Sequence, residues 1–249
     1  MEKISSRKNA YIRHLRLLAA DAAYRREMGE YLCDGHKLLE EALSCGAAVS
    51  SVLWKEREQT LPGLENATQY VAPADLFDYA SPMKNSPGPL FAVRIRGCGK
   101  PGAMRNAIVL ENVQDPGNVG TVLRTANAFG IDTVILTGDC ADPFHPKTVR
   151  ATMGAIFRQK IIRMELPYVK GMLDDMGLPL YGAALDPAAK DIRSLDLRHA
   201  AVAIGSEGRG LSAELLALCR DKLLIPMQPE SESLNAAVAA AVCMWEMSR

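Results

Sequence analysis

Residues 111–130, ENVQDPGNVGTVLRTANAFG, decide the fold that we predict for this chain. They follow the apolar run of residues 107–110, which predicts a buried strand. Asp115 is a favourable helix N-cap, and Pro116 suits the first helical position, where a missing N–H group costs nothing. The glycine at the end of the stretch suits the end of that helix, and a second apolar run begins at residue 133. The stretch therefore predicts a βαβ unit.

The rest of the chain extends this alternation in both directions. On the C-terminal side, strands are expected over residues 180–184, 201–204 and 223–227, and helices over 166–176 and from 232 onward. On the N-terminal side, strands are expected over 49–54, 69–71 and 90–95, and helices within 10–45, broken around Gly29. We predict an α/β protein with a smaller domain over residues 1–98, a Gly- and Pro-containing linker over 99–104, and a larger domain over 105–249. The larger domain is expected to hold a mostly parallel sheet with helices on both faces.

Polar side chains gather where the first strand of the larger domain ends. They are Asn112, Gln114, Asp115, Asn118, Arg124 and Asn127. In open α/β sheets, ligands bind outside the carboxyl ends of the strands, so this position favours a binding site. Spacing alone leaves a second interpretation open, namely a capped surface helix with a solvated arginine.

Two later stretches also concern chemistry. Residues 205–210, GSEGRG, follow a buried strand, and glycines at such a place allow close backbone approach or a tight turn. Their order differs from the G-x-G-x-x-G of a dinucleotide-binding fold, so a phosphate cradle has little support. The final helix, with Ser231 or Ser233 near its start, is apolar on every side. Such a helix is expected to be buried in a core or in a subunit interface.

Composition and charge limit the class of protein. The 249 residues are 48% hydrophobic, and 29 Lys and Arg residues balance 29 Asp and Glu residues, so net charge does not indicate a nucleic-acid partner. Basic residues nevertheless concentrate in three islands, at residues 1–26, 90–110 and 146–164. These islands could be separate solvated faces or could converge on one surface that binds a polyanion.

The cysteines and the termini suggest a soluble, cytoplasmic protein without a metal. The six cysteines are scattered, with no CxxC pair and no histidine at ligand spacing, which argues against a zinc site and for a reducing compartment. The N-terminus has no apolar core of a secretory signal. The most apolar stretch, residues 236–245, is too short to span a membrane.

Three of these stretches together resemble the signature of a known family. NVQDPGNVGTVLRTANAFG (112–130), GSEGRGLS (205–212) and IPMQPESESLN (225–235) are similar, in order, to the three motifs of the SpoU (TrmH-like) RNA 2′-O-ribose methyltransferases. KTVRATMGAIF (147–157) resembles the intermediate K-x-x-R-A-x-x-G-A segment of that family. CDGHKLLEEAL (33–43) is a looser match to the family's L30e-like substrate-binding domain.

The resemblance implies a fold, a cofactor and partners. The larger domain would be a SPOUT domain whose C-terminal segment forms a trefoil knot, although nothing in composition or spacing indicates a knot. The protein would bind S-adenosyl-L-methionine and form a homodimer, with no membrane and no metal. Its substrate would be structured RNA, and the L30e-like first domain favours rRNA, in particular 23S rRNA, over tRNA.

The resemblance also implies roles for five polar residues. Arg124 would act on the ribose hydroxyl; because a guanidinium is a poor base, orienting the hydroxyl and stabilising its developing negative charge is the easier role. Asn118 would help to set the site, and Glu207 would hold Arg124 or a loop amide. Ser233 and Asn235 would bind the substrate or fix the knot.

The methyl donor would contact four further residues, Thr137, Gly205, Ile225 and Leu234, mostly through backbone and apolar groups. The chain departs from the family pattern at three positions. Pro229 replaces the usual glycine of the third motif and removes a backbone N–H group beside the site of the methyl donor. Thr152 stands where serine is commoner, and Asp34 where glutamate is.

Alternative functions remain open. The enzyme could methylate tRNA, or the chain could be a non-catalytic RNA-binding protein on the same scaffold. A third possibility is a nucleotide-dependent oxidoreductase on an unknotted sheet, which the order of the glycines in residues 205–210 disfavours.

Overall fold

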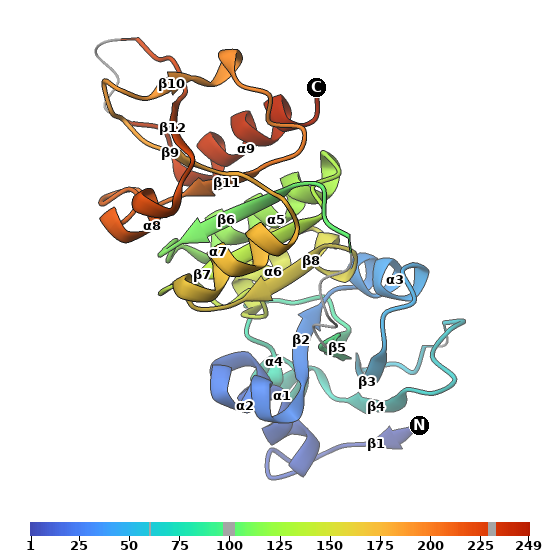
Figure 1. Ribbon diagram of the computed structural model, residues 1–249. Helices are drawn as coiled ribbons and strands as arrows, with labels where there is room; N and C mark the ends of the chain where they lie inside the picture. The colour runs from blue at the N-terminus through green and yellow to red at the C-terminus, as the bar shows by residue number, and fades with distance from the viewer. Residues whose placement is uncertain (60, 97–102, 229–232) are drawn as a thin grey trace. The chain divides into compact units, whose positions relative to one another are not determined.

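The computed structural model describes residues 1–59, 61–96, 103–228 and 233–249 of the chain (Figure 1). Its contacts divide the chain into two compact units. Unit 1 comprises Met1–Gly97 and Asp142–Phe157, and unit 2 comprises Cys98–Ala141 and Arg158–Arg249. The segment 142–157 thus packs with the N-terminal residues. The division at residues 98–105 stays a prediction, and most of its linker, residues 99–102, lies outside the described residues.

Unit 1 is a mixed five-stranded sheet with helices. Its strands are β1 (Glu2–Lys3), β2 (Glu30–Asp34), β3 (Val49–Lys55), β4 (Thr68–Ala72) and β5 (Leu90–Arg94), in the order β1-β4-β3-β5-β2. Its helices are α1 (Ala10–Ala20), α2 (Ala22–Met28), α3 (His36–Ser44), α4 (Ala74–Ala80), α6 (Pro146–Ala151) and the 3-10 turn η1 (Ala155–Phe157). β5 runs antiparallel to β2 and β3, whereas β4 is parallel to β1 and β3.

The first helical region has one more break than the sequence predicted. Gly29 ends α2 with a left-handed φ of 62°, as expected. Asp21 adds a second break, because its carboxylate accepts hydrogen bonds from the backbone N–H groups of Ala23 and Tyr24 and so starts α2. Helix α1 therefore ends at Ala20, before the break that was predicted around Gly29.

Unit 2 is a seven-stranded sheet in which every pairing is parallel. Its strands are β6 (Ala107–Glu111), β7 (Thr133–Thr137), β8 (Lys160–Arg163), β9 (Leu180–Ala183), β10 (Lys190–Asp191), β11 (Ala201–Ile204) and β12 (Asp221–Leu224), in the order β10-β12-β9-β11-β6-β7-β8. Its helices are α5 (Pro116–Ala128), α7 (Leu166–Asp175), α8 (Ala213–Leu218), α9 (Ala236–Met247) and the 3-10 turn η2 (Ile192–Ser194). The predicted α/β class with a parallel sheet is confirmed. The strand predicted at 223–227 begins two residues earlier and ends before Pro226.

The stretch that decided the prediction folds as expected. Asp115 caps α5 by accepting a hydrogen bond of 2.8 Å from the backbone N–H of Asn118, and Pro116 is the first helical residue. The apolar stripe of the helix, Val119, Val122, Leu123 and Ala126, is buried. Gly130, with φ of 68°, follows the C-cap residue. Local signals therefore set both ends of this helix.

Helices cover both faces of the parallel sheet. Along β6, successive side chains point to opposite faces, and all five residues are buried. Val109 packs in one cluster with Val169 of α7 and Leu215 of α8. On the other side, α5 contacts β7, α9 contacts β11, and the two helices pack against each other. The loops at the carboxyl ends of the strands therefore lead to helices on both faces of the sheet.

Helix α9 differs from its prediction at its start and in its burial. It begins at Ala236 with Asn235 as N-cap, four residues after the predicted start at residue 232. Ala240, Cys243 and Met244 are buried, whereas Val238 and Trp245 are 48% and 57% exposed. Within the described ranges, one apolar side of the helix is therefore left uncovered. The trefoil knot stays a prediction. Within the described part of the chain, no helix combines the length and apolarity that crossing a membrane requires.

Candidate active site

Three of the predicted site residues meet at the carboxyl end of the parallel sheet. Asn118 lies in the first turns of α5, Glu207 in the loop after β11, and Asn235 at the start of α9. The Glu207 Oε1 atom accepts hydrogen bonds from the Asn118 Nδ2 atom at 2.5 Å and from the Asn235 Nδ2 atom at 2.6 Å. Asn235 Nδ2 also donates to Asn118 Oδ1 at 3.1 Å. Segments far apart in the sequence thus form one polar cluster.

Asn235 connects this cluster to the backbone of α9. Its Oδ1 atom accepts from the N–H groups of Ala237 and Val238, at 3.0 and 3.3 Å. The oxygen therefore caps the helix while the nitrogen binds Glu207 and Asn118. The orientation of the amide is fixed, because each end has its own partners.

The loop that carries Glu207 is a tight turn that requires glycine at Gly205. A Cβ atom at Gly205 would lie 2.1 Å from the backbone carbon of Gly210. Gly210 takes a left-handed φ of 66°, and its N–H donates to the Ser206 carbonyl at 2.8 Å. The glycines therefore let the loop close on itself and present Glu207 toward α5.

A buried carboxylate that the sequence prediction missed anchors the same loop. Glu111, the last residue of β6, is 4% exposed. It accepts hydrogen bonds from the Ser212 backbone N–H at 2.7 Å and from the Ser212 hydroxyl at 2.6 Å. Ser212 in turn caps α8 by accepting a hydrogen bond of 3.0 Å from the backbone N–H of Leu215. The one available signal was an acidic residue ending an otherwise apolar strand.

A cavity of about 480 Å³ lies beside the loop. Three of the four predicted donor contacts, Gly205, Ile225 and Leu234, line it, and so do Glu207 and Ser233. Apolar residues from the ends of β9, β11 and β12 make up most of the remaining wall. Size and lining are those of a small-molecule site, with an apolar pocket and a few convergent polar groups.

The model of the SpoU rRNA Methylase family matches residues 105–245, which include the polar cluster and the cavity. The chain belongs to the SpoU rRNA methylase family. The resemblance seen in the three motifs is thereby confirmed. SpoU-type proteins of known structure are also similar to this chain over nearly its whole length, as the following comparisons show.

The chain is 33% identical over 248 residues to the 23S rRNA (guanosine(2553)-2′-O)-methyltransferase RlmP of Bacillus subtilis (strain 168), an alignment that covers 99% of each chain. It superposes on the AdoMet-bound rRNA methyltransferase from Sinorhizobium meliloti with a TM-score of 0.87, at 25% identity and over 99% of this chain and 97% of that one. The SpoU methyltransferase AviRb from Streptomyces viridochromogenes in complex with AdoMet gives a TM-score of 0.84, at 25% identity and over 97% and 98%. These similarities include unit 1 as well as the SpoU domain.

Other predicted site residues of this SpoU domain lie outside the polar cluster. Arg124 lies on α5, six residues after Asn118, and therefore about 120° away around the helix axis. Its side chain is exposed and forms no hydrogen bond or ion pair with another described residue. Thr137 ends β7, is 1% exposed, and does not line the cavity. Pro229 lies outside the described residues.

Proposed function

We propose that the protein methylates a ribose 2′-hydroxyl of 23S rRNA with S-adenosyl-L-methionine as methyl donor. One observation carries the proposal: Glu207, which accepts hydrogen bonds from Asn118 and Asn235, lines a cavity of ligand size in a chain aligned end to end with a 23S rRNA 2′-O-methyltransferase. A solved structure whose title concerns 2-OH methylation on tRNA covers 59% of the chain, whereas the alignment with the 23S rRNA enzyme covers 99%. The oxidoreductase alternative conflicts with the family to which the chain belongs.

The cavity fits the methyl donor in size and chemistry. Its volume of about 480 Å³ lies in the range of small-molecule and cofactor sites. Gly205 offers backbone, and Ile225 and Leu234 offer apolar surface, to an adenosine and a methionine moiety. When bound, S-adenosyl-L-methionine supplies a methyl group already activated on a positively charged sulfur. Thr137 remains a proposed contact at the end of β7.

The protein's own residues then make the ribose hydroxyl reactive. Because a guanidinium is a poor base, Arg124 donates hydrogen bonds to the hydroxyl and stabilises the negative charge that develops on its oxygen. Glu207 holds the amides of Asn118 and Asn235 and thereby fixes the wall on which the ribose is oriented. Ser233, exposed at the edge of the cavity, is a proposed hydrogen-bond partner of the substrate.

Arg124 gives the test of this mechanism. In Arg124→Ala, we expect the rate of transfer of labelled methyl to an unmodified 23S rRNA transcript to fall about 100- to 1000-fold, because a donor to the developing oxyanion is lost. The affinity for S-adenosyl-L-methionine, measured by calorimetry, should stay unchanged. Arg198→Ala is the matched control, since Arg198 is an exposed arginine of unit 2 paired with Asp196. Full activity of Arg124→Ala would contradict the mechanism, and absence of transfer by the wild type would contradict the function.

We also propose that the active protein is a homodimer in the cytoplasm. Val238, Val242 and Trp245 recur at helical spacing on α9 and are at least 36% exposed, although the opposite side of the helix is buried. A second copy of the chain would cover this apolar stripe. The described cysteines, five in number, are free thiols, which agrees with a reducing compartment.

A further inference from the structure

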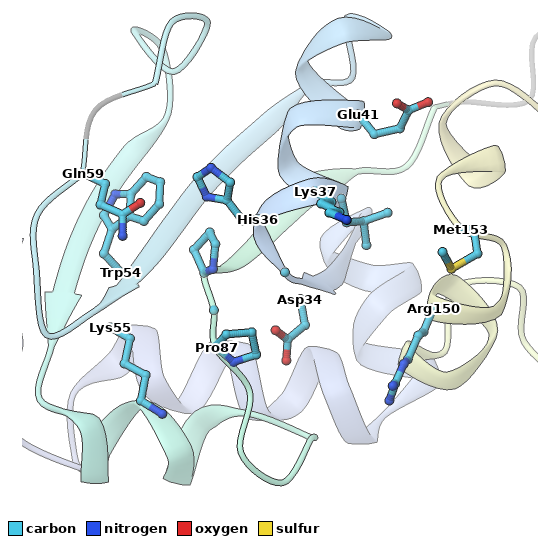
Figure 2. A pocket seen from close by; sticks show the side chains of 14 residues that line it. Asp34, His36, Lys37, Glu41, Trp54, Lys55, Gln59, Pro87, Arg150 and Met153 are labelled. Atoms are coloured by element: carbon cyan, nitrogen blue, oxygen red, sulfur yellow. The ribbon is translucent and has the colours of Figure 1, made fainter.

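Unit 1 carries three cavities that are rich in basic side chains. The first, of about 370 Å³, is lined by Arg7, Lys8, Arg13, Arg16, Leu17, Ala20 and Tyr79. The second, of about 490 Å³, is lined by Ala19, Pro82, Met83, Lys84, His145, Pro146, Lys147 and Arg150. The third, of about 710 Å³, includes His36, Lys37, Lys55 and Arg150, together with Asp34 and Glu41 (Figure 2).

These cavities follow one another along the surface of unit 1. Lining residues of the first two cavities neighbour each other in the chain at two places. Ala19 and Ala20 are consecutive at the end of α1, and Tyr79 lies in the last turn of α4, which Pro82 follows by two residues. The second and third share Arg150. In the third cavity, Asp34 lies between Lys55 and Arg150, so negative charge enters there (Figure 2). The first two cavities therefore form one purely basic path that ends at Arg150.

We call this path the basic track and define it by Arg7, Lys8, Arg13, Arg16, Lys84, Lys147 and Arg150. No carboxylate lines its two cavities, all of whose lining residues are described. Within the described ranges of the chain, no ion pair neutralises any of the seven cations. Burial and the nearby Arg25 lower the pKa of His145, so this side chain adds no charge at neutral pH. Cations gathered in this way repel one another unless a polyanion joins them.

The track unites two basic islands of the sequence. Lys147 and Arg150 belong to the segment 142–157, and a buried ion pair holds this segment in unit 1. The Arg25 guanidinium, 2% exposed, donates to Asp142 Oδ2 at 2.9 Å through Nε and at 2.6 Å through Nη2. Residues separated by more than a hundred positions thus contribute to one surface.

Two of the arginines are held in place before any ligand arrives. The Arg7 and Arg16 guanidinium carbons lie 4.6 and 4.1 Å from the centre of the Tyr79 ring. Arg16 also donates to the Tyr79 hydroxyl. Stacking on an aromatic ring reduces the rotamer entropy that an arginine loses when it binds a phosphate. Such preorganisation distinguishes the track from a scatter of mobile surface lysines.

We propose that the basic track binds the sugar–phosphate backbone of the RNA substrate and positions unit 1 on it. Arginine and lysine side chains without partners are the groups that contact phosphates, and such contacts fix register without reading sequence. The inference rests on the proposed function, since it names the surface that holds that enzyme's RNA.

The test removes three charges of the track whose side chains form no hydrogen bond and no ion pair with another described residue. In Arg13→Gln/Lys84→Gln/Lys147→Gln, we expect the Kd for an unmodified 23S rRNA transcript, measured by filter binding, to rise at least about tenfold. The slope of log K against log salt should become shallower by about 2 to 3, because each lost phosphate contact contributes close to one. The KM for the transcript should rise while kcat and the Kd for S-adenosyl-L-methionine stay unchanged.

The matched control is Lys3→Gln/Arg26→Gln/Arg57→Gln, which removes the same charge from exposed positions of unit 1 that line neither cavity. It should bind the transcript like the wild type. An equal loss in both triple variants, or wild-type affinity and salt slope in the track variant, would overturn the track. So would a wild type that does not bind the transcript. A wild type that binds through the track without transferring methyl would instead overturn the proposed function alone.

Discussion

Asn235 has two tasks at the site, and they can be separated chemically. Its side-chain oxygen caps α9, and its side-chain nitrogen donates to Glu207 and Asn118. Aspartate caps a helix as well as asparagine does, but it has no N–H group to donate. An aspartate at this position would also place a second carboxylate beside Glu207.

We therefore expect Asn235→Asp to fold normally and to methylate poorly. Its Tm should stay within a few degrees of the wild type, because the cap is retained. Its kcat should fall about 100-fold, because the cluster that orients the ribose loses its central donor. Asn235→Ser, which keeps a cap and adds no charge, separates loss of the donor from repulsion. Unchanged kcat in both variants would show that the cluster has no part in the reaction.

At the scale of helices and strands, local sequence signals predicted the elements well, whereas contacts between segments far apart in the sequence were not predicted. The cap and the end of α5 were predicted because both lie within the sixteen residues 115–130. Strand β8 was not predicted, since cations at both of its ends hide a short apolar core at the edge of the sheet. The hydrogen bonds between Glu111 and Ser212 were not predicted, because an acidic residue at the end of an apolar strand does not identify a partner 101 positions away.

In the candidate active site, too, sequence motifs predicted individual residues, whereas contacts between distant segments were not predicted. Family motifs predicted Asn118, Glu207 and Asn235, and the structure brings these three together. The catalytic and donor-binding roles assigned to them and to Arg124 stay predictions. The placement of residues 142–157 in unit 1 could not be foreseen, because it depends on the pairing of Arg25 with Asp142, 117 positions away. Pairings of this kind require the folded chain.

That pairing gives a prediction about stability. Asp142→Ala should destabilise unit 1 by about 3 kcal/mol, because the buried guanidinium of Arg25 loses its carboxylate partner, while the carbonyls of Leu18 and Ala19 still accept from it. The double variant Arg25→Met/Asp142→Leu should recover most of this loss, since both charges are then gone. Urea unfolding followed by Trp54 fluorescence in a Trp245→Phe background reports on unit 1 alone. Equal destabilisation by the single and double variants would show that the loss comes from packing and not from the unpaired charge.

For the whole molecule, two observations favour a homodimer: the absence of a described partner for the Arg124 side chain and the exposed apolar side of α9. Arg124 has no partner among the described residues, and Val238 and Trp245 are apolar and exposed in the same unit. A second copy of the chain would cover the exposed side of α9 and supply a neighbour for Arg124 at the proposed active site. Dimerisation and catalysis should then be lost together.

Val238→Glu tests this directly, because it places a charge on the exposed stripe without touching the buried side of α9. We expect the wild type to have about twice the chain mass of 27.0 kDa by light scattering and Val238→Glu to have about the mass of one chain. Methyl transfer should fall with the dimer, while the melting of unit 1 stays unchanged. Tyr168→Glu, at a residue 67% exposed on α7, introduces the same charge on the opposite side of the sheet and should remain dimeric and active. A wild type that is monomeric at micromolar concentration and still transfers methyl would exclude the dimer as the active form.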